Sequence, residues 1–359
     1  MNQNPSITGL GLITPLGRSA DETWQVLLAG RFIRDHSRAM IEPGVDRIHR
    51  MAIAAAKEAL AQAQWTEDDL ADPFTAMIVG TSKGPVEKFL LAGESCDFGL
   101  ADLTTTIARE LKLGSGPRCA MSAACASGLH ALIQGILLLR NGVARRVLVV
   151  SAEASVHPMF VGSFRRLGVI PPEGHGCRPF DVDRQGFLIS EAAAAVCLEF
   201  DRNVKPLAAI DRFALCADAT HLTGGDPNGG AHRYLLHKII DGRPIDLIHA
   251  HGTGTLFNDP IELTAIESQL LPGHNIPNLY SHKSALGHSL GAAGLVAIVL
   301  NCLIHQTGTI PGNVQTRKPI DTKSVCIDQN PVKRPVHRSM AIAAGFGGAM
   351  AGVSLIAHD

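Results

Sequence analysis

The chain has 359 residues, of which 46% are hydrophobic, so it can bury a large core as two domains or one layered unit. A formal net charge of −1 excludes a general attraction to nucleic acid or anionic membranes. The start of the chain lacks the features of a secretory signal, and no apolar run approaches the ~20 residues of a membrane span. The eight cysteines are scattered without a CxxC pair, which predicts reduced thiols in a cytoplasmic protein.

Buried strands alternate with helices along the first half of the chain. Residues 6–17 form a predicted strand that runs into a glycine-rich turn, and Asp21 is the expected cap of the next helix. An alanine-rich helix is predicted over 51–64, a buried strand over 76–81 and another helix over 104–113. This alternation indicates an α/β fold whose sheet is buried on both faces.

Cys125 lies in a run of small residues, 123–128, that leads into the apolar segment 131–139. The pattern predicts a thiol on a tight turn at a helix N-terminus, where free amides and the helix dipole lower the pKa of a cysteine and can hold an oxyanion. We therefore expect Cys125 to be a nucleophile and the most reactive thiol of the chain. The alternative is a structural cysteine in a well-packed core.

The second half of the chain repeats the order of the first. A strand and glycine turn over 246–253 resemble 77–81, and a small-residue turn with an apolar helix over 288–303 resembles the Cys125 region. The strand 339–345 then occupies the place of 147–151. The repetition predicts an internal duplication in which matching strand ends converge on one site. The residues expected to meet there are Cys125, His251, His288 and Gly345.

Four motifs, in this order, resemble one family across almost the whole chain. They are the Cys125 loop, HGTGT with His251, KSALGH from Lys283 to His288, and GFGG with Phe346. Together they resemble β-ketoacyl-acyl-carrier-protein synthases of the elongating, Cys-His-His type. The resemblance implies a thiolase-like α/β fold, internally duplicated and layered α-β-α-β-α, with an N-terminal half over 1–204 and a C-terminal half over 205–359.

The resemblance also implies a role for each site residue. Cys125 would attack an acyl thioester, and the backbone N–H groups of Cys125 and Phe346 would form the oxyanion hole. His251 and His288 would hydrogen-bond the enolate oxygen formed when a malonyl thioester loses carbon dioxide, and Lys283 would orient the neighbouring histidine. The remaining implied positions are the pantetheine contacts Thr253 and Thr255 and the gate loop Gly345, Phe346, Gly347 and Gly348.

The implied substrates travel on the phosphopantetheine of an acyl carrier protein, with no cofactor and no metal held by the enzyme. A zinc site built from the clustered histidines is disfavoured, because no carboxylate or thiol completes a ligand spacing. Those histidines are His249, His251, His282 and His288.

Two kinds of protein partner are expected. The carrier protein is acidic, so Arg47, Arg50 and Arg166 are its predicted docking residues. A homodimer through the strand around 147–150 is the implied assembly, with a heterodimer of two synthase-like chains as the alternative.

Two other functions stay open beside a condensing enzyme of fatty-acid, polyketide or polyene synthesis. One is a non-condensing, chain-length subunit of a heterodimer, and the other is a thiolase-like acyltransferase that uses coenzyme A. The sequence also departs from the family pattern at Ala297, where a glutamate is common, and at Ala349 and Met350, which replace Thr-Asn.

Overall fold

The computed structural model describes residues 4–44, 46–92, 99–200, 204–270 and 275–358. The strands of its first half are β1 (Ser6–Ile13), β2 (Thr75–Gly80), β3 (Arg118–Met121), β4 (Arg146–Glu153) and β5 (Ala192–Glu199). They are ordered β3-β2-β4-β5-β1. The pairs β3-β2 and β2-β4 are parallel, whereas β5 is antiparallel to both of its neighbours.

The second half repeats this arrangement strand for strand. Its strands are β6 (Ala208–Ala217), β7 (Leu247–His249), β8 (Asn278–Tyr280), β11 (Arg338–Ala344) and β12 (Ala349–Ala357). The order β8-β7-β11-β12-β6 and the strand directions match those of the first half, and β6 pairs with β1 to join the halves into one sheet. The internal duplication is therefore confirmed. The predicted boundary between residues 204 and 205, which falls between β5 and β6, stays a prediction.

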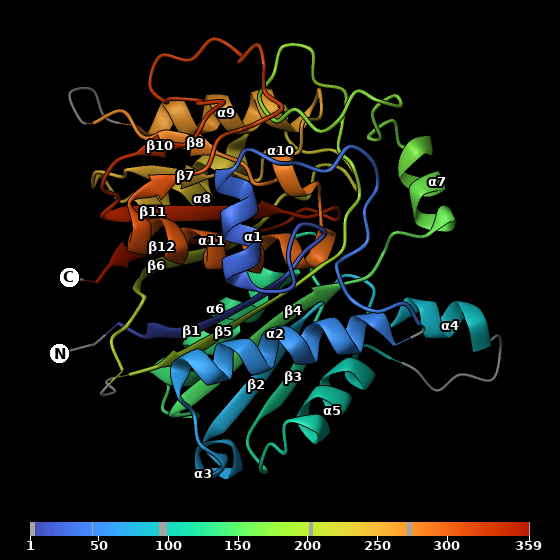
Figure 1. The fold of residues 1–359 in the computed structure, drawn as a ribbon. Helices are drawn as coiled ribbons and strands as arrows, with labels where there is room; N and C mark the ends of the chain where they lie inside the picture. The colour runs from blue at the N-terminus through green and yellow to red at the C-terminus, as the bar shows by residue number, and fades with distance from the viewer. Residues whose placement is uncertain (1–3, 45, 93–98, 201–203, 271–274, 359) are drawn as a thin grey trace.

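Helices lie between and outside the two halves, which gives the predicted α-β-α-β-α layers (Figure 1). The central layer holds α6 (Ser127–Arg140) and α11 (Ala293–Thr307), with α1 (Ala20–Leu28) beside α11. The outer helices are α2 (Arg47–Ala63), α3 (Glu67–Ala71) and α5 (Leu100–Glu110) on the first half, and α8 (Gly230–Ile240) and α9 (Asn258–Gln269) on the second. The other elements are α4 (Val86–Ala92), α7 (Pro158–Arg166), α10 (Lys283–Leu286), η2 (Leu290–Ala292), β9 (Thr309–Ile310) and β10 (Val332–Lys333).

The two central helices begin beside each other because a glycine lets their first turns touch. A Cβ at Gly128 would lie 2.8 Å from the backbone nitrogen of Leu295, closer than a side chain allows. Cys125 directly precedes α6 and His288 directly precedes the turn into α11, so this contact brings the two residues to one place. The stretch 290–307 is long and apolar enough to cross a membrane, but 78% of it is buried inside the protein, as in a core helix.

Two helix starts differ from the predictions. The cap of α1 is Ser19 rather than Asp21, because the Ser19 hydroxyl accepts a hydrogen bond from the backbone N–H of Glu22. α2 begins at Arg47, earlier than predicted, because the buried face of its first turn carries the polar side chains of Arg47 and His49. A hydrophobic pattern does not detect such a turn.

Arg47 is not available to a partner, so its predicted role in carrier-protein docking is wrong. Its side chain is 4% exposed and forms an ion pair with Glu191, which lies just before β5. It also donates to the carbonyl groups of Ala39 and Ile41. Burial raises the pKa of Glu191, and the Arg47 guanidinium opposes this rise. Arg47 thus ties α2 to the segment that enters β5.

Replacing Arg47 by Ala is expected to lower the free energy of unfolding by about 3–5 kcal/mol, because the Glu191 carboxylate would be left buried and unpaired. Arg50→Ala is the matched control. This half-buried side chain donates to the carbonyl of Pro43, and its loss is expected to cost about 1 kcal/mol or less. Denaturant unfolding of both variants measures the difference, and equal losses would contradict a structural role specific to Arg47.

β4 is not an edge strand, so the predicted dimer contact through residues 147–150 is wrong. It pairs with β2 on one side and with β5 on the other. Among the described residues, the sheet ends at β3 and at β8. The segment of Cys326 covers β8, since Leu279 donates to the Cys326 carbonyl and Cys326 donates to Pro277. A sheet-to-sheet dimer would therefore use β3.

Candidate active site

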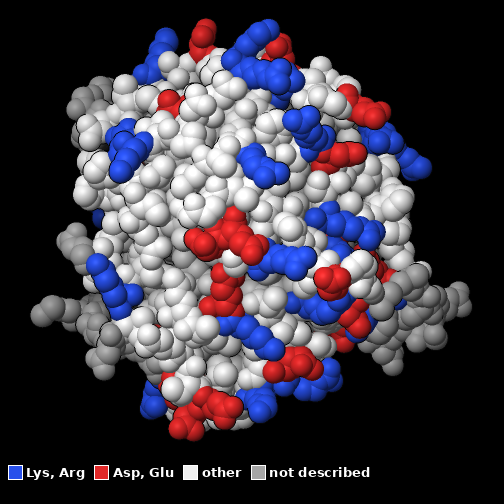
Figure 2. Space-filling model, in the orientation of Figure 1, with Lys and Arg blue, Asp and Glu red and all other residues white. Residues whose placement is uncertain are grey.

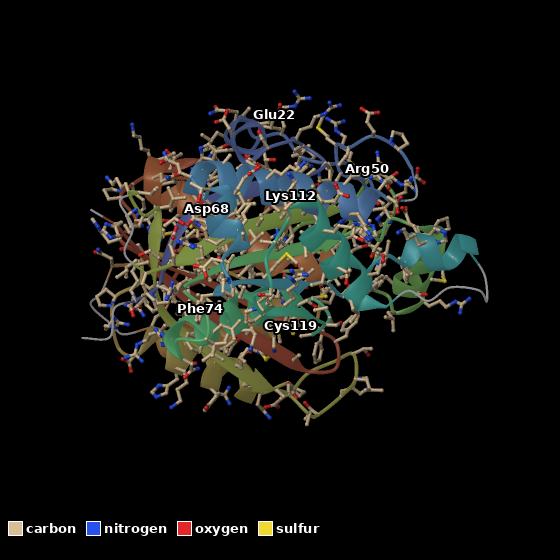
Figure 3. The ribbon with its side chains drawn as sticks, turned by 90° about the horizontal axis from the view of Figure 1, so that it is seen from below. Glu22, Arg50, Asp68, Phe74, Lys112 and Cys119 are labelled. Atoms are coloured by element: carbon tan, nitrogen blue, oxygen red, sulfur yellow. The ribbon has the colours of Figure 1, made fainter. Side chains whose placement is uncertain are left out.

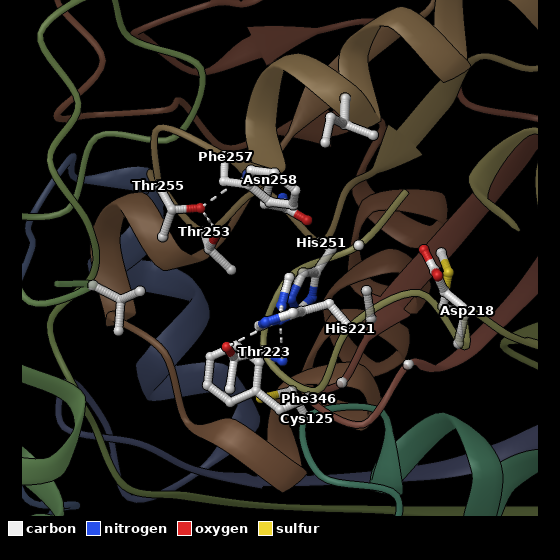
Figure 4. Close-up of a pocket in the computed structure, with 18 of the residues that line it drawn as sticks. Cys125, Asp218, His221, Thr223, His251, Thr253, Thr255, Phe257, Asn258 and Phe346 are labelled. Carbon is white, nitrogen blue, oxygen red and sulfur yellow. Dashed lines mark hydrogen bonds between the residues drawn. The ribbon is translucent and has the colours of Figure 1, made fainter. Parts of the chain in front are cut away.

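One cavity of about 280 Å³ lies where the ends of β7 and β11 meet the start of α6 (Figure 4). Cys125, His251 and His288 all line it. The structure therefore brings these three residues together, whereas their chemical roles stay predictions. The other predicted residues in its wall are Thr253, Thr255, Gly345, Phe346 and Gly348.

Cys125 occupies a tight turn immediately before α6, as expected from the sequence. Ala124 has a φ of 48°, in the left-handed region that non-glycine residues seldom adopt, and Ala126 caps the helix. The thiol is buried, and burial raises the pKa of Cys125 to about 11 although the charges of Lys83 and Lys283 oppose the rise. The expected low pKa is therefore wrong, because desolvation of the thiolate exceeds the effect of the nearby positive charges.

Two buried carboxylates of α9 hold the loop that carries His251. The backbone N–H groups of His251 and Gly252 donate to Glu262 at 2.6 and 2.8 Å. Those of Thr253 and Gly254 donate to Asp259 at 3.0 and 3.1 Å. Burial raises the pKa of Asp259 to about 6 and that of Glu262 as well. Neither acid was predicted from the sequence, although their i, i+3 spacing shortly after HGTGT was a usable signal.

Lys283 holds the same loop from the other side. Its buried ammonium donates to the backbone carbonyl of His251. The backbone N–H of the same residue donates to the Glu262 carboxylate. Burial lowers the pKa of Lys283, and the charge of Glu262 opposes this effect. Lys283 is therefore placed to position the His251 peptide. The described contacts include no hydrogen bond from its side chain to a histidine ring.

The His288 and His251 rings pack against each other in the cavity wall. The two ring centroids are 5.6 Å apart with the planes at 81°, and Phe187 packs edge-on against His288 at 4.9 Å. Burial lowers the pKa of both histidines well below the ordinary value, and the charge of Lys283 lowers them further. Both imidazoles are therefore neutral near pH 7. A neutral imidazole can donate one hydrogen bond and carries no positive charge.

The gate loop approaches Cys125 through its backbone. A Cβ at Gly345 would lie 2.6 Å from the Ala123 carbonyl oxygen and 3.2 Å from the Cys125 amide nitrogen, so this position requires glycine. Gly347 donates to Leu222, which ties the loop to the segment after β6, and the Phe346 ring lies 6.1 Å from Phe164. The backbone of the gate loop at Gly345 therefore lies against the Cys125 turn.

A second pair of buried histidines lies behind the cavity. His249 forms hydrogen bonds of 2.8 Å with the Asn301 side chain on α11 and with the His282 ring, which adjoins Lys283. Burial lowers the pKa of His249 to about 3. Ala297, the position where a glutamate was expected, is one turn before Asn301 on the same helix and is also buried. Asn301, His249 and His282 therefore form a hydrogen-bonded network of neutral side chains that ends beside Lys283.

The two remaining candidate docking residues lie outside the cavity wall. Arg166 is exposed at the end of α7, and Arg50 is half-buried on α2. On the face shown in Figure 2, basic and acidic side chains are interspersed. Docking at Arg50 and Arg166 stays a prediction.

Iodoacetamide at pH 7 is expected to label Cys326 before Cys125, the reverse of the expectation from the sequence. Cys326 is exposed, whereas the Cys125 thiol is buried and largely protonated. Peptide mapping after limited alkylation measures the order of labelling, and Cys326→Ser should leave Cys119 as the remaining exposed thiol of the described residues. Earlier labelling of Cys125 would show that its thiolate forms despite burial.

The duplicated fold, with Cys125, His251 and His288 in one cavity, defines a protein of the thiolase-like superfamily. The N-terminal domain of β-ketoacyl synthases matches residues 32–203, and the C-terminal domain of these synthases matches residues 207–317. The chain therefore belongs to the β-ketoacyl synthase family, whose members are condensing enzymes of fatty-acid or polyketide type.

Full-length relatives support this assignment. The chain is 28% identical to 3-oxoacyl-[acyl-carrier-protein] synthase 2 of Rhizobium meliloti (strain 1021), with 97% of both chains covered. The solved ishigamide ketosynthase/chain length factor is 28% identical, with a TM-score of 0.89 and full coverage of both chains. A chain of AntDE:AntF, a type II polyketide synthase acyl-carrier protein in complex with its ketosynthase bound to the hexaketide, has a TM-score of 0.90 over the full length of both chains at 22% identity, which shows a shared fold.

Proposed function

We propose that this chain is a 3-oxoacyl-[acyl-carrier-protein] synthase that joins an acyl group on Cys125 to a malonyl unit carried by an acyl carrier protein. The observation that carries the proposal is that the Cys125 thiol lines the same cavity as His251 and His288, whose imidazoles are neutral. A plain acyltransferase needs the thiol, whereas decarboxylation additionally needs neutral donors at the enolate oxygen.

The first half-reaction forms the acyl-enzyme. The Cys125 sulfur attacks the thioester carbonyl, and the thiol proton passes to a neutral imidazole of the cavity and then to the departing pantetheine sulfur. A bond forms between the acyl carbonyl carbon and the Cys125 sulfur, and the bond between that carbon and the pantetheine sulfur breaks. The amides of Cys125 and Phe346 are the proposed donors to the tetrahedral oxyanion.

The second half-reaction forms the carbon–carbon bond. The malonyl carbon–carboxylate bond breaks and carbon dioxide leaves, while His251 and His288 donate hydrogen bonds to the developing enolate oxygen. The enolate carbon attacks the carbonyl carbon of the acyl-cysteine, and the bond between that carbonyl carbon and the Cys125 sulfur breaks. The thiolate regains a proton, and a 3-oxoacyl thioester remains on the carrier protein. Thr253 and Thr255, whose hydroxyls are 3.0 Å apart, are the proposed pantetheine contacts.

The deciding experiment is incubation of the protein with acyl- and malonyl-carrier protein, followed by mass spectrometry of protein and product. The proposal predicts an acylated Cys125 peptide, carbon dioxide and a 3-oxoacyl-carrier protein. Acylation without release of carbon dioxide would favour the acyltransferase, and coenzyme A thioesters serve as its test substrates. Inertness toward every donor would favour the non-condensing, chain-length subunit. Arg50 and Arg166 remain the proposed carrier-protein contacts, and a cytoplasmic location is part of the proposal.

A homodimer through β3 is expected, so sedimentation should give twice the 38.0 kDa chain mass. Cys119 is exposed on β3 of the single chain (Figure 3), so pairing of two β3 strands should slow its alkylation. Exposed Cys326, on the opposite end of the sheet, is the internal reference. Dilution that dissociates the dimer should restore the labelling of Cys119. A stable monomer, or activity seen after adding a second synthase-like chain, would contradict the homodimer.

A further inference from the structure

Phe257 is an aromatic residue at the mouth of the Cys125 cavity that the proposed mechanism does not use. It directly precedes α9, lines the cavity and is 47% exposed. Within the described part of the chain, it belongs to none of the hydrophobic clusters that form the core. Burial of apolar area is favourable, so a ring that stands open in a cavity wall has contact area to offer to a ligand.

The loop that carries His251 leads from the interior of the cavity to its mouth. His251 and Thr253 are buried, Thr255 is half-buried and Phe257 is exposed, and all four line the cavity. In the view of Figure 4, Thr253, Thr255 and Phe257 follow one another away from Cys125. This wall therefore presents two hydroxyl groups first and an apolar ring nearer to solvent.

The apolar part of the wall continues along α9, and no side chain covers it from the opposite side. Ile261 follows Phe257 by one helical turn and also lines the cavity. The segment that faces the ring contains Gly224 and Gly225, which line the cavity as well. A Cβ at Gly225 would lie 3.9 Å from Cε1 of the Phe257 ring. The ring thus borders an opening whose other side is bare backbone.

The pantetheine arm carries its polar and apolar groups in the same order as this wall. From the sulfur outward it has two amide groups, then a hydroxyl and a carbon that bears two methyl groups. When the thioester lies at Cys125, the amides are nearer to the cavity interior, where the hydroxyls of Thr253 and Thr255 can bond them. The dimethyl carbon is nearer to the mouth, where its methyl groups gain from burial against an apolar ring.

We propose that Phe257 is a substrate-binding residue whose ring packs against the dimethyl carbon of the pantetheine arm. The inference deepens the proposed function and rests on it. It predicts that the ring matters for thioesters that include this carbon and much less for thioesters that end before it.

The test compares two donors of the same acyl group, an acyl-pantetheine and an acyl-N-acetylcysteamine. The second donor keeps the thioester and the first amide but ends before the dimethyl carbon. Intact-protein mass spectrometry gives the second-order rate constant of Cys125 acylation for each donor. In Phe257→Ala, the ratio of the pantetheine to the N-acetylcysteamine rate constant should fall about 4–15-fold, the value of one or two buried methyl groups. Phe257→Leu keeps an apolar side chain and should retain most of the ratio.

Leu256→Ala is the matched control. Leu256 adjoins Phe257, is 68% exposed and lies outside the cavity wall. Its replacement should keep the wild-type ratio, because the substitution removes a comparable apolar side chain from the same loop without touching the opening. A fall in the ratio as large as that of Phe257→Ala would show that the ratio reports the loop and not the ring.

The outcomes separate the two proposals. A wild type acylated by neither donor would overturn the proposed function and this inference with it. Normal acylation with a wild-type ratio in Phe257→Ala would overturn the inference alone, and so would a wild type that uses both donors equally well. Equal loss with both donors would show that the ring shapes the cavity as a whole, which would also overturn it. A loss seen with acyl-carrier protein but with neither small donor would place the ring against the carrier protein instead of the arm.

Discussion

Cys125→Ala is expected to abolish acyl-enzyme formation and to reduce condensation by a factor on the order of 10⁶, the loss seen when the nucleophile of a well-studied hydrolase is removed. Decarboxylation of malonyl-carrier protein should persist, because the alanine leaves His251 and His288 in place at the cavity floor. Mass spectrometry of the protein and measurement of released carbon dioxide follow the two half-reactions separately.

Cys177→Ala is the matched control for this substitution. Cys177 is also a buried thiol, with its pKa raised to about 12 by burial, and its sulfur lies 3.8 Å from the Thr253 carbonyl oxygen. Its replacement should leave acylation of Cys125 measurable. Loss of acylation in Cys177→Ala together with full acylation of Cys125→Ala would show that Cys177, and not Cys125, is the nucleophile.

Replacing His251 or His288 by Ala is expected to reduce carbon dioxide release about 10²–10³-fold, the usual cost of one donor to a developing oxyanion. Acyl-enzyme should still form at a measurable rate, because Cys125 and the adjacent amides remain. The two effects differ since the enolate charge appears in the decarboxylation step. A loss confined to acylation, with normal carbon dioxide release, would contradict these roles.

The pH dependence gives an independent check on the same residues. The neutral imidazoles are the proposed active form, and their pKa values are held well below the ordinary 6.5. Protonation therefore begins far below neutrality, and carbon dioxide release by the wild type should stay level between pH 8 and pH 6.5. A decline centred near pH 6.5 would show an ordinary, solvated histidine. His305 is a partly buried histidine on α11 that lies outside the cavity wall. His305→Asn is therefore the control for the general effect of replacing such a histidine.

Local patterns predicted the duplicated fold well. The strand-turn-helix units around Cys125 and around His288 follow from short runs of apolar and small residues, and such runs depend on neighbours in the chain. The correspondence of β2 with β7 and of β4 with β11 is visible in the sequence for the same reason. The order of the motifs then placed Cys125, His251 and His288 at matching ends of the two halves.

Tertiary contacts decided the properties that depend on distant residues. Arg47 reads as a surface charge, yet it is buried against Glu191, a residue 144 positions away. The Cys125 thiol has a raised pKa because the whole fold closes over it. The backbone of His251 is fixed by Glu262 and Lys283, which come from different elements. Burial and pairing are sums over residues that only folding brings together, so neither periodicity nor motif spacing in the chain reports them.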